Sequence, residues 1–382
     1  MVRLSEVQEA AGLLSGIAQR TPVLTSSSLS SRSSGTVLIK AEHLQRTGSF
    51  KIRGAYVRLC KLDDDQRKRG VVAASAGNHA QGVAWAASAL GIRSTVVMPV
   101  FAPLQKVEAT RRYGAQVELS GDTFEDSLRR AREIASECGS VLVHAFDDPW
   151  IMSGQGTVGL EICQDVKEAD RVVVPLGGGG LISGVATAVK ALCPSTKIIG
   201  VRPSSAPATI ADGVAVKRPG DQTQPVIDAL VDDIVSVDED EISAAILFAL
   251  ERMKQVLEGA GALAVAGVLA GAVPTTGTSV LIASGGNIDP GLLMRVIRHG
   301  LSQAGRYLFV RLELTDRPGE LQSVLTLLAD KLVNVLSVVH HRAGASLAVG
   351  AVDVELLLET RNRDHATEVV RALGQAGYSV RL

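Results

Sequence analysis

The chain has 382 residues and a formal net charge of -1, with 46% hydrophobic and 21% charged residues. This composition predicts a globular protein of two or three domains, and it gives no sign of a nucleic acid or a membrane as partner. The four cysteines lie far apart and form no CxxC motif, which argues against a disulfide framework and favours the cytoplasm.

The N-terminus, MVRLSEVQEA, contains no apolar signal core. The longest run of small apolar residues is AGALAVAGVLAGAV, at 260–273, and it is too short to span a bilayer. We therefore expect this run to form a buried helix.

Strand-like and helix-like patterns alternate from about residue 36 to residue 300. The predicted strands have the sequences GVVAAS, RSTVVMP, AQVELSG, RVVVPL, KIIGVRP and TSVLIAS. Because these runs are continuously apolar, they favour parallel strands covered on both faces. The predicted fold class is therefore α/β, with doubly wound open sheets.

The pattern changes after Leu301. Residues 306–342 predict a strand, a turn, a helix and a strand, and residues 348–382 add a strand, a helix and a final strand. This β-α-β-β-α-β order fits a ferredoxin-like module of about 75 residues. The predicted boundary lies at 302–306. Within the α/β part, residues 212–226 are the best candidate for a mobile surface loop.

Lys51 stands between Phe50 and Ile52 in the stretch TGSFKIRGA, at the predicted start of a helix with Ser49 as its N-cap. The positive end of the helix and the apolar neighbours both disfavour an ammonium group, so we expect a lowered pKa for Lys51. The stretch alone leaves two interpretations open: a poorly placed surface lysine, or one that must act as a free amine.

Three glycine-containing stretches follow predicted strands: SAGNHA at 75–80, GGGGLISG at 177–184 and SGGN at 284–287. Since the carboxyl ends of parallel strands line one crevice, all three should face the same site. The amides of SAGNHA could bind a carboxylate, or the stretch could be a tight turn with a capping asparagine. Four consecutive glycines could bind a phosphate, or form a flexible turn. A lone Ser284 would usually be a core hydroxyl.

A phosphate-binding loop, a lysine with a lowered pKa and a carboxylate-binding loop together suggest pyridoxal 5'-phosphate, which carries a phosphate and an aldehyde that reacts with lysine. The histidines are scattered, so no metal site is expected from them. A nicotinamide dehydrogenase is not supported, because no glycine run has the GxGxxG setting.

The motifs SFKIRGA, SAGNHAQGVA, GGGGLISG and SGGN, in this order, resemble those of fold-type-II pyridoxal-phosphate enzymes, and among them the serine/threonine dehydratase group. The stretch VVMPVFAPLQKVEATRRYGAQVEL is similar to that group too. The tail LELTDRPGELQSVLTLLADKLVNVLSVVHHR resembles an ACT regulatory domain. The resemblance implies a catalytic domain at 1–304, with a smaller subdomain at about 52–146 inserted in it, and an ACT-like domain at 305–382.

The resemblance also implies residue roles. Lys51 would bind the cofactor covalently, Phe50 would pack beside its ring, Asn78 would hydrogen-bond its phenolic oxygen, and Ser284 would meet the pyridine nitrogen. The backbone amides that would bind the phosphate are those of Gly177, Gly178, Gly179, Gly180 and Leu181. The loop that would bind the substrate carboxylate comprises Ser75, Gly77, Asn78 and His79.

The implied reaction is deamination of L-threonine to 2-oxobutyrate and ammonia, with L-serine as a second substrate. A serine hydroxyl cannot stabilise a fully protonated pyridinium, so Ser284 would leave the ring a weaker electron sink, which suits direct β-elimination. Lys51, as a neutral amine, would remove the Cα proton, and the cofactor phosphate would supply a proton to the leaving hydroxyl.

Two departures from related serine racemases limit the reaction and the metal content. Ala76 replaces a serine that acts as the second acid/base in those enzymes, so we expect weak racemisation. Arg202 and Ala208 stand where those relatives carry metal-binding carboxylates, so we expect no such metal site.

The resemblance implies an amino-acid effector, isoleucine or valine, at the turn of the ACT-like module. The candidate effector residues are Asp316, Pro318, Gly319, Glu320 and Leu321. The alternative is a module that only oligomerises, and a homodimer or homotetramer is expected. The other functional alternatives are a serine dehydratase or racemase, a β-replacement enzyme such as a cysteine synthase, and a non-catalytic amino-acid sensor.

Overall fold

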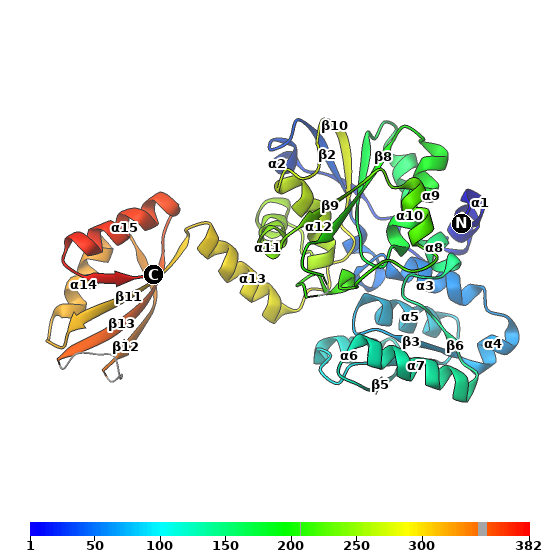
Figure 1. Cartoon of the computed structure of the whole chain (residues 1–382), viewed down its shortest axis with the longest axis horizontal. Coiled ribbons are helices and arrows are strands. Elements are labelled where there is room, and N and C mark those ends of the chain that lie inside the picture. Colours follow the sequence, from blue (N-terminus) through cyan, green and yellow to red (C-terminus); the bar gives the residue numbers. More distant parts are fainter. Residues whose placement is uncertain (207, 343–349) are drawn as a thin grey trace. The chain divides into compact units, whose positions relative to one another are not determined.

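Two parallel sheets and one antiparallel sheet organise the residues described by the computed structural model, which are 1–206, 208–342 and 350–382. The chain divides into two compact units, Met1–Pro290 and Gly291–Leu382. Both parallel sheets belong to the first unit and the antiparallel sheet to the second (Figure 1). The predicted α/β fold with parallel sheets is confirmed for the first unit. The domain boundary at 302–306 stays a prediction.

The larger sheet has six strands, and all neighbours except one pair are parallel. In order across the sheet the strands are β1 (Val23–Thr25), β2 (Gly35–Lys40), β10 (Gly277–Ile282), β7 (Arg171–Pro175), β8 (Lys197–Pro203) and β9 (Asp233–Val237). The exception is the edge strand β1, which runs antiparallel to β2. The predicted strands RVVVPL, KIIGVRP and TSVLIAS correspond to β7, β8 and β10.

Strand β9 was not predicted from the sequence. Within it only Val237 is buried, and Asp233 and Ser236 interrupt the apolar run. Because β9 is an edge strand, it lacks the continuous apolar pattern that identifies a strand covered on both faces.

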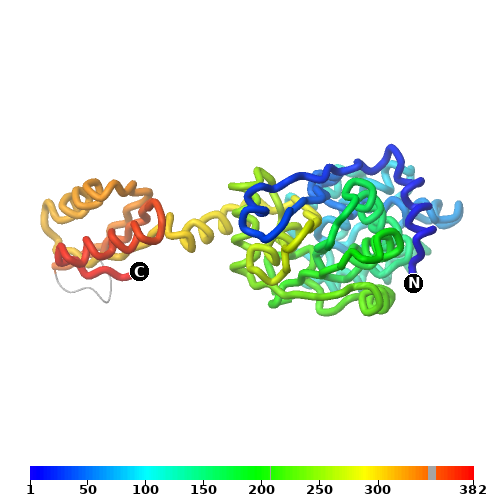
Figure 2. The backbone as a smooth tube through the Cα atoms, turned by 90° about the horizontal axis from the view of Figure 1, so that it is seen from above, coloured from blue at the N-terminus to red at the C-terminus, as the bar shows by residue number. Residues whose placement is uncertain are grey.

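Helices cover both faces of the larger sheet (Figure 1). The helices of this part of the chain are α1 (Leu4–Leu13), α2 (Ser27–Ser30), α8 (Pro149–Asp165), α9 (Gly180–Leu192), α10 (Gln224–Leu230), α11 (Glu239–Phe248) and α12 (Gly259–Leu269). Short 3-10 turns lie at Glu42–Leu44, Arg46–Gly48 and Asp212–Val214, and a π-helical turn at Ala249–Met253. Figure 2 shows α1 beside α8 and α9, against which it packs.

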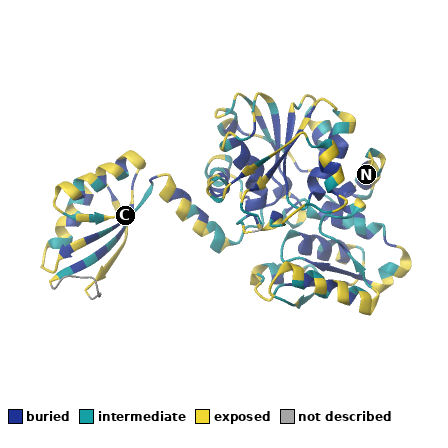
Figure 3. Ribbon diagram, viewed as in Figure 1, coloured by how far each residue is buried: buried dark blue, intermediate teal, exposed yellow. Residues whose placement is uncertain are grey.

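Helix α12 is the buried helix predicted from its run of small apolar residues. It contacts β7, β8, β9 and β10, and nearly all of its residues are buried. Figure 3 shows the same burial along the central strands. No helix in the described part of the chain is long and apolar enough to cross a membrane.

The smaller sheet is wholly parallel and comes from residues that lie in the chain between β2 and β7. In order across the sheet its strands are β5 (Gln116–Leu119), β4 (Ser94–Met98), β3 (Val71–Ala74) and β6 (Val141–Leu142). Its helices are α3 (Lys51–Cys60), α4 (Asp64–Arg69), α5 (Asn78–Ala89), α6 (Leu104–Arg112) and α7 (Phe124–Cys138).

Alternate residues of β3 pack against opposite layers of helices, as a strand buried on both faces requires. Val71 and Ala73 share a hydrophobic cluster with residues of α3 and α5, whereas Val72 and Ala74 share one with Ala131 of α7. Both faces of β3 are therefore closed to water, and its carboxyl end leads directly to the loop at 75–77.

The prediction that Ser49 caps helix α3 is wrong. The N-cap residue is Phe50, which has helical backbone angles, and no side chain caps the helix. Ser49 instead forms a bridge with Gly285, and its Oγ has no hydrogen-bond partner among the residues that the structure describes. A contact with a segment more than 230 positions away in the chain therefore overrides the local capping preference.

The second unit has the predicted β-α-β-β-α-β order after α13 (Pro290–Gln303). Its elements are β11 (Tyr307–Thr315), α14 (Glu320–Asp330), β12 (Asn334–His341), β13 (Ala351–Glu359), α15 (Arg363–Gln375) and β14 (Ser379–Arg381). The sheet order is β12-β13-β11-β14, and both helices contribute to a core with residues such as Leu312 and Leu356. Residues 348 and 349 of the predicted third strand lie outside the described residues.

Candidate active site

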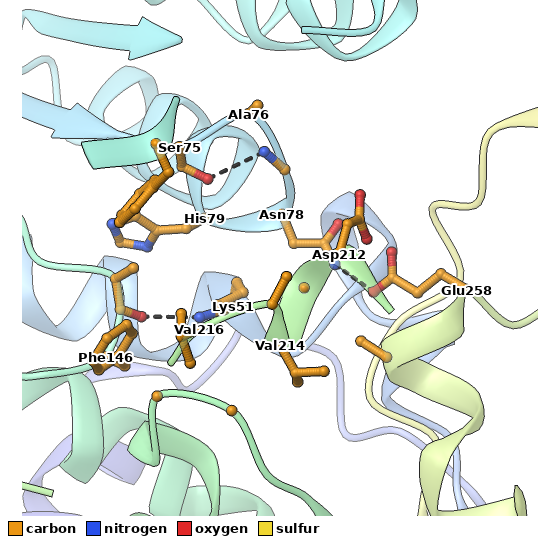
Figure 4. Close-up of a pocket in the computed structure, with 18 of the residues that line it drawn as sticks. Lys51, Ser75, Ala76, Asn78, His79, Phe146, Asp212, Val214, Val216 and Glu258 are labelled. Carbon is orange, nitrogen blue, oxygen red and sulfur yellow. Dashed lines mark hydrogen bonds between the residues drawn. The ribbon is translucent and has the colours of Figure 1, made fainter. Parts of the chain in front are cut away.

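The loops that follow β3, β7 and β10 line one cavity of about 520 Å³ in the first unit. A cavity of this size can hold a small-molecule cofactor together with a substrate. Every residue predicted to bind a cofactor or a substrate lines it. These residues are Phe50, Lys51, Ser75, Gly77, Asn78, His79, Gly177, Gly178, Gly179, Gly180, Leu181 and Ser284. Figure 4 labels Lys51, Ser75, Asn78 and His79 among them. The structure thus brings together four stretches that are widely separated in the chain.

Lys51 lies in the first turn of α3 with its amine in the cavity. Its Nζ donates a hydrogen bond to the backbone oxygen of Ala145 at 2.9 Å and lies 5.3 Å from the centre of the Phe50 ring. Desolvation lowers the pKa of Lys51 to about 8, although the Glu258 carboxylate opposes this. The direction is the one that the sequence predicted. A substantial fraction of this amine is therefore neutral near pH 8, as a nucleophile or a base requires.

The glycine loop, residues 177–180, connects β7 to α9 and can be formed only by residues without a side chain. A Cβ atom on Gly178 would lie 2.3 Å from the Phe146 ring, and one on Gly177 would lie 2.7 Å from the Cα of Val214. Gly179 has a φ of +94°, in the left-handed region. Since α9 begins at Gly180, the loop presents amides at a helix N-terminus, where a phosphate is bound favourably.

The loop from Ser75 to His79 connects β3 to α5, on the other side of the cavity. The Ser75 Oγ accepts a hydrogen bond from the amide of Gly77 at 3.1 Å. Asn78 is the first residue of α5. Its side-chain amide forms one hydrogen bond with Glu258 and another with Asn287. The loop is therefore ordered by one internal hydrogen bond and by two with residues outside it, and Figure 4 shows it facing Lys51 across the cavity.

His79 is buried, and its imidazole is neutral. Burial, followed by the nearby Lys51 charge, lowers the pKa of His79 to about 3. One ring nitrogen, Nε2, hydrogen-bonds the backbone oxygen of Val143 at 3.0 Å, while Nδ1 has no partner among the described residues. The imidazole thus offers no positive charge to a carboxylate. If His79 binds the substrate carboxylate, it must do so through its backbone amide.

Ser284 lies two residues after β10 and is buried at the cavity wall. Its Oγ makes a long contact of 3.4 Å with the backbone oxygen of Ala260, and its own backbone oxygen accepts a hydrogen bond from Phe50 at 3.2 Å. The hydroxyl is thus weakly engaged by the protein and can bond to a ligand.

The sequence predictions missed several residues that line the cavity. Those with a side chain of chemical consequence are Lys106, Asp122, Phe146, Asp212, Val214, Val216 and Glu258. Asp212, Val214 and Val216 belong to the segment predicted to be a surface loop. The one sequence signal for Glu258 was a single carboxylate directly before an apolar helix. Burial, followed by the negative charge of Asp212, raises the pKa of Glu258 to about 7.

The predicted effector residues belong to the second unit. Gly319 is the N-cap of α14 with a φ of +97°, and Asp316 forms an ion pair of 3.5 Å with Arg342. The turn is therefore well formed, and its binding of an effector stays a prediction.

The cavity residues fit pyridoxal phosphate. The glycine loop presents backbone amides at positions where a Cβ atom would collide with neighbouring residues, the Lys51 amine has a lowered pKa, and the Ser284 hydroxyl is weakly engaged. An anion-binding loop and a reactive amine in one cavity are the two elements that this cofactor requires.

Comparisons with known proteins identify the family. The family model described as pyridoxal-phosphate dependent enzyme matches residues 14–285. An L-threonine ammonia-lyase of Thermotoga maritima is 46% identical over 400 residues, and the match covers 100% of both chains.

Solved structures are similar over most of the chain. The structure of maize serine racemase has 36% sequence identity and a TM-score of 0.74, and the match covers 79% of this chain and 98% of that one. The processed form of threonine deaminase isoform 2 from Solanum lycopersicum has 37% identity and a TM-score of 0.73, with 77% of this chain and 87% of that one covered.

Proposed function

The chain belongs to the family of pyridoxal-phosphate-dependent enzymes, and we propose that it deaminates L-threonine to 2-oxobutyrate and ammonia, and L-serine to pyruvate. The observation that carries this proposal is the Lys51 amine, with its pKa lowered to about 8, in the same cavity as the glycine loop. The identity of 46% to a threonine ammonia-lyase, over the whole of both chains, supports threonine as the substrate.

The cofactor would be held by groups on opposite sides of the cavity. The amides of the glycine loop and Leu181 would bind its phosphate, and Lys51 would bind it covalently. Phe50 would pack beside its ring, Ser284 would meet the ring nitrogen and Asn78 the phenolic oxygen. When bound, the cofactor supplies an aldehyde that reacts with amines and a ring that withdraws electrons from Cα.

The protein then has to bind the substrate, move protons and exclude water. The loop that contains Ser75, Gly77, Asn78 and His79 leads into the N-terminus of helix α5, so the substrate carboxylate would be bound favourably there. Lys51, as a neutral amine, would take the Cα proton. The β-hydroxyl would then leave as water, and hydrolysis of the released enamine would consume a water to give 2-oxobutyrate and ammonia.

Racemisation is the second candidate activity, since maize serine racemase is similar over most of this chain. A racemase needs a proton donor on each face of the substrate. Ala76 lines the cavity and presents only a methyl group, which can neither donate nor accept a proton. We therefore propose that racemisation is weak relative to deamination.

The Lys51→Ala substitution tests the proposed function. We expect turnover of threonine to fall by about a thousandfold or more, because a base and a nucleophile are lost together, and the visible absorbance of the bound cofactor to disappear. The matched control is Lys167→Ala, since Lys167 is exposed and lies outside the cavity. Retained turnover and absorbance in Lys51→Ala would refute the assignment.

The second unit is proposed to be an ACT-like regulatory domain at 305–382, following a catalytic domain at 1–304 with a smaller subdomain at about 52–146. Its β-α-β-β-α-β order and the turn before α14 support this proposal. Isoleucine or valine would bind at Asp316, Pro318, Gly319, Glu320 and Leu321. Thermal-shift measurements with single amino acids test it, because a ligand that binds only the folded state raises the Tm. An unchanged Tm with every amino acid would leave oligomerisation as the role of this unit.

We also propose that the protein is a homodimer or a homotetramer and lies in the cytoplasm. Strand β12 is an edge strand with three apolar residues about 40% exposed, Leu336, Val338 and Val339. Such a strand is suited to pairing with a second copy. Light scattering of the full chain would measure the oligomeric state.

A further inference from the structure

The orientation of the Asn78 amide is fixed by hydrogen bonds at both of its ends. Asn287 Nδ2 donates to the backbone oxygen of Thr47 at 2.6 Å, which identifies that atom as the nitrogen of the Asn287 amide. The same Nδ2 donates to Asn78 Oδ1 at 2.8 Å. Asn78 must therefore present its own Nδ2 on the other side, where it donates to Glu258 Oε1 at 2.5 Å.

The Asn78 Nδ2 group carries two hydrogens, and Glu258 takes one of them. The second hydrogen remains for a ligand in the cavity that Asn78 lines. If the amide were reversed, two oxygen atoms would face each other at Glu258 and two nitrogen atoms at Asn287. Glu258 and Asn287 thus decide which atom of Asn78 a ligand meets.

The Glu258 carboxylate occupies a space beside the backbone of Gly285. The residue is 4% exposed, and its amide donates to the backbone oxygen of Gly285 at 3.1 Å. A Cβ atom on Gly285 would lie 2.1 Å from Glu258 Oε1 and 3.1 Å from Asn78 Nδ2. Glycine at position 285 therefore leaves the space in which this hydrogen bond is made.

Three charged groups act on the Glu258 carboxyl from three different elements. Asp212, from the turn Asp212–Val214, is a neighbouring negative charge, while Lys106 of α6 and Lys51 of α3 are positive. Lys106 forms an ion pair with Asp212 that connects the part of the chain around the smaller sheet to the part around the larger one. Both of these residues line the cavity together with Glu258. Figure 4 shows Asp212 beside Glu258.

We propose that Glu258 is a positioning residue that, with Asn287, holds Asn78 so that an N–H group meets the cofactor, and that the Lys106–Asp212 ion pair controls the ionisation of Glu258. This proposal rests on the proposed function, in which Asn78 contacts the cofactor. The ionised carboxylate is the stronger acceptor for the Asn78 N–H group, because a charge-assisted hydrogen bond is stronger than a neutral one.

A specific pH dependence follows. The pKa of Glu258 is raised to about 7 by burial and then by Asp212, while Lys106 lowers it. Cofactor binding should weaken as the pH falls through about 7. We call this decrease in affinity the acid limb, and hereafter the limb. Removing the Asp212 charge should lower the pKa of Glu258 and move the limb to lower pH. Removing the Lys106 charge should raise that pKa and move the limb to higher pH. A merely structural role for these residues would not produce shifts of opposite sign.

The test uses the full chain and pyridoxal phosphate as the ligand. The cofactor dissociation constant and the visible absorbance of the bound cofactor are measured between pH 5.5 and 9 (about the range that brackets these groups). The variants are Glu258→Gln, Asp212→Asn and Lys106→Met. Glu168→Gln is the matched control, since Glu168 is exposed and lies outside the cavity.

In Glu258→Gln we expect cofactor affinity above pH 7 to fall about tenfold, the usual effect of losing one hydrogen bond to a charged group. The decrease in affinity near pH 7 should disappear, while the one that comes from the Lys51 amine near pH 8 should remain. Asp212→Asn and Lys106→Met should move the limb in opposite directions, and Glu168→Gln should match the wild type. Asp212 is more than half exposed, so its variant tests the idea even if Glu258→Gln folds poorly.

The proposal is overturned if Glu258→Gln keeps the wild-type affinity and pH profile, or if Asp212→Asn and Lys106→Met leave the limb in place or move it the same way. In either case the proposed function stands, because the wild type still binds the cofactor. A wild-type protein that binds no pyridoxal phosphate would instead refute the proposed function, and this inference with it.

Discussion

Two sides of the cavity are built by different means, although both are proposed to bind the same cofactor. The glycine loop uses backbone amides, and its shape is enforced by neighbours that leave no room for a Cβ atom. The opposite side uses the amide network, which we define as Asn78, Glu258 and Asn287, three side chains from distant parts of the chain. A backbone site tolerates no added atom, whereas a side-chain site depends on charge and on hydrogen-bond direction.

The largest effect is expected at the glycine loop. In Gly178→Ala the new Cβ would lie 2.3 Å from the Phe146 ring, so the ring or the loop must move. We expect the unfolding free energy to fall by about 3 kcal/mol through overpacking, and cofactor affinity to fall about a hundredfold because the amides lose their alignment. Urea denaturation and titration with pyridoxal phosphate measure the two effects.

The control for Gly178→Ala is Gly12→Ala. Gly12 lies in helix α1, and a Cβ atom there would meet nothing within 4 Å. Alanine is the better helix former, so this variant should gain up to about 1 kcal/mol of stability and keep the wild-type affinity. A Gly178→Ala protein as stable as Gly12→Ala would show that Phe146 moves away freely and that the glycine loop is not sterically enforced.

The same contrast explains what could be predicted from the sequence. The glycine run, Lys51 and the loop at 75–80 were found because each is a short local pattern placed after a recognisable strand. The loops follow the carboxyl ends of parallel strands in the two sheets, β3 in the smaller sheet and β7 and β10 in the larger one, and they meet in one cavity. The roles of Phe50, Asn78 and Ser284 were implied only by the resemblance to a family.

What could not be predicted depends on contacts between distant segments. Glu258 meets Asn78 across 180 positions of the chain, and Lys106 meets Asp212 across 106. Ser49 looked like a helix cap but pairs with Gly285. Only the folded chain brings these groups together, and a single carboxylate or serine in a sequence carries no sign of its distant partner.

The second prediction concerns the free energy of unfolding that is lost when Glu258, in the amide network, is ionised. Burial raises the pKa of Glu258 from its ordinary value of 4.5 to about 7. A raised pKa in the folded state means that stability from this group is fully present below pH 4.5 and is lost as the pH rises through 7. Above pH 7 the folded protein must therefore hold a buried carboxylate at a cost in free energy.

We accordingly expect Glu258→Gln, without cofactor, to be more stable than the wild type at pH 8 by about 2 kcal/mol, with a difference that shrinks towards pH 5. Urea denaturation at both pH values measures it, with Glu168→Gln as the control. An equal difference at both pH values would show that the effect comes from packing rather than from ionisation. If Glu258→Gln is more stable but binds the cofactor more weakly, Glu258 lowers stability in favour of function, as is expected of a functional residue.

The smallest effect is expected at Gly77, on the same side as the amide network. A Cβ atom on Gly77 would meet nothing within 4 Å, and its φ of -133° lies outside the left-handed region that favours glycine. Gly77→Ala should therefore keep its unfolding free energy within about 0.5 kcal/mol of the wild type, and its cofactor affinity within about twofold.

The comparison between Gly77→Ala and Gly178→Ala makes the difference between the two sides quantitative, because the chemical change is identical and only the surroundings differ. The methyl group of Gly77→Ala would enter the open space of the cavity beside the proposed carboxylate site. We expect its effect to fall on the KM for threonine rather than on folding, which steady-state kinetics and urea denaturation distinguish. A loss of stability as large as that of Gly178→Ala would mean that both loops depend on glycine, and that hydrogen-bond direction alone does not shape the Asn78 side.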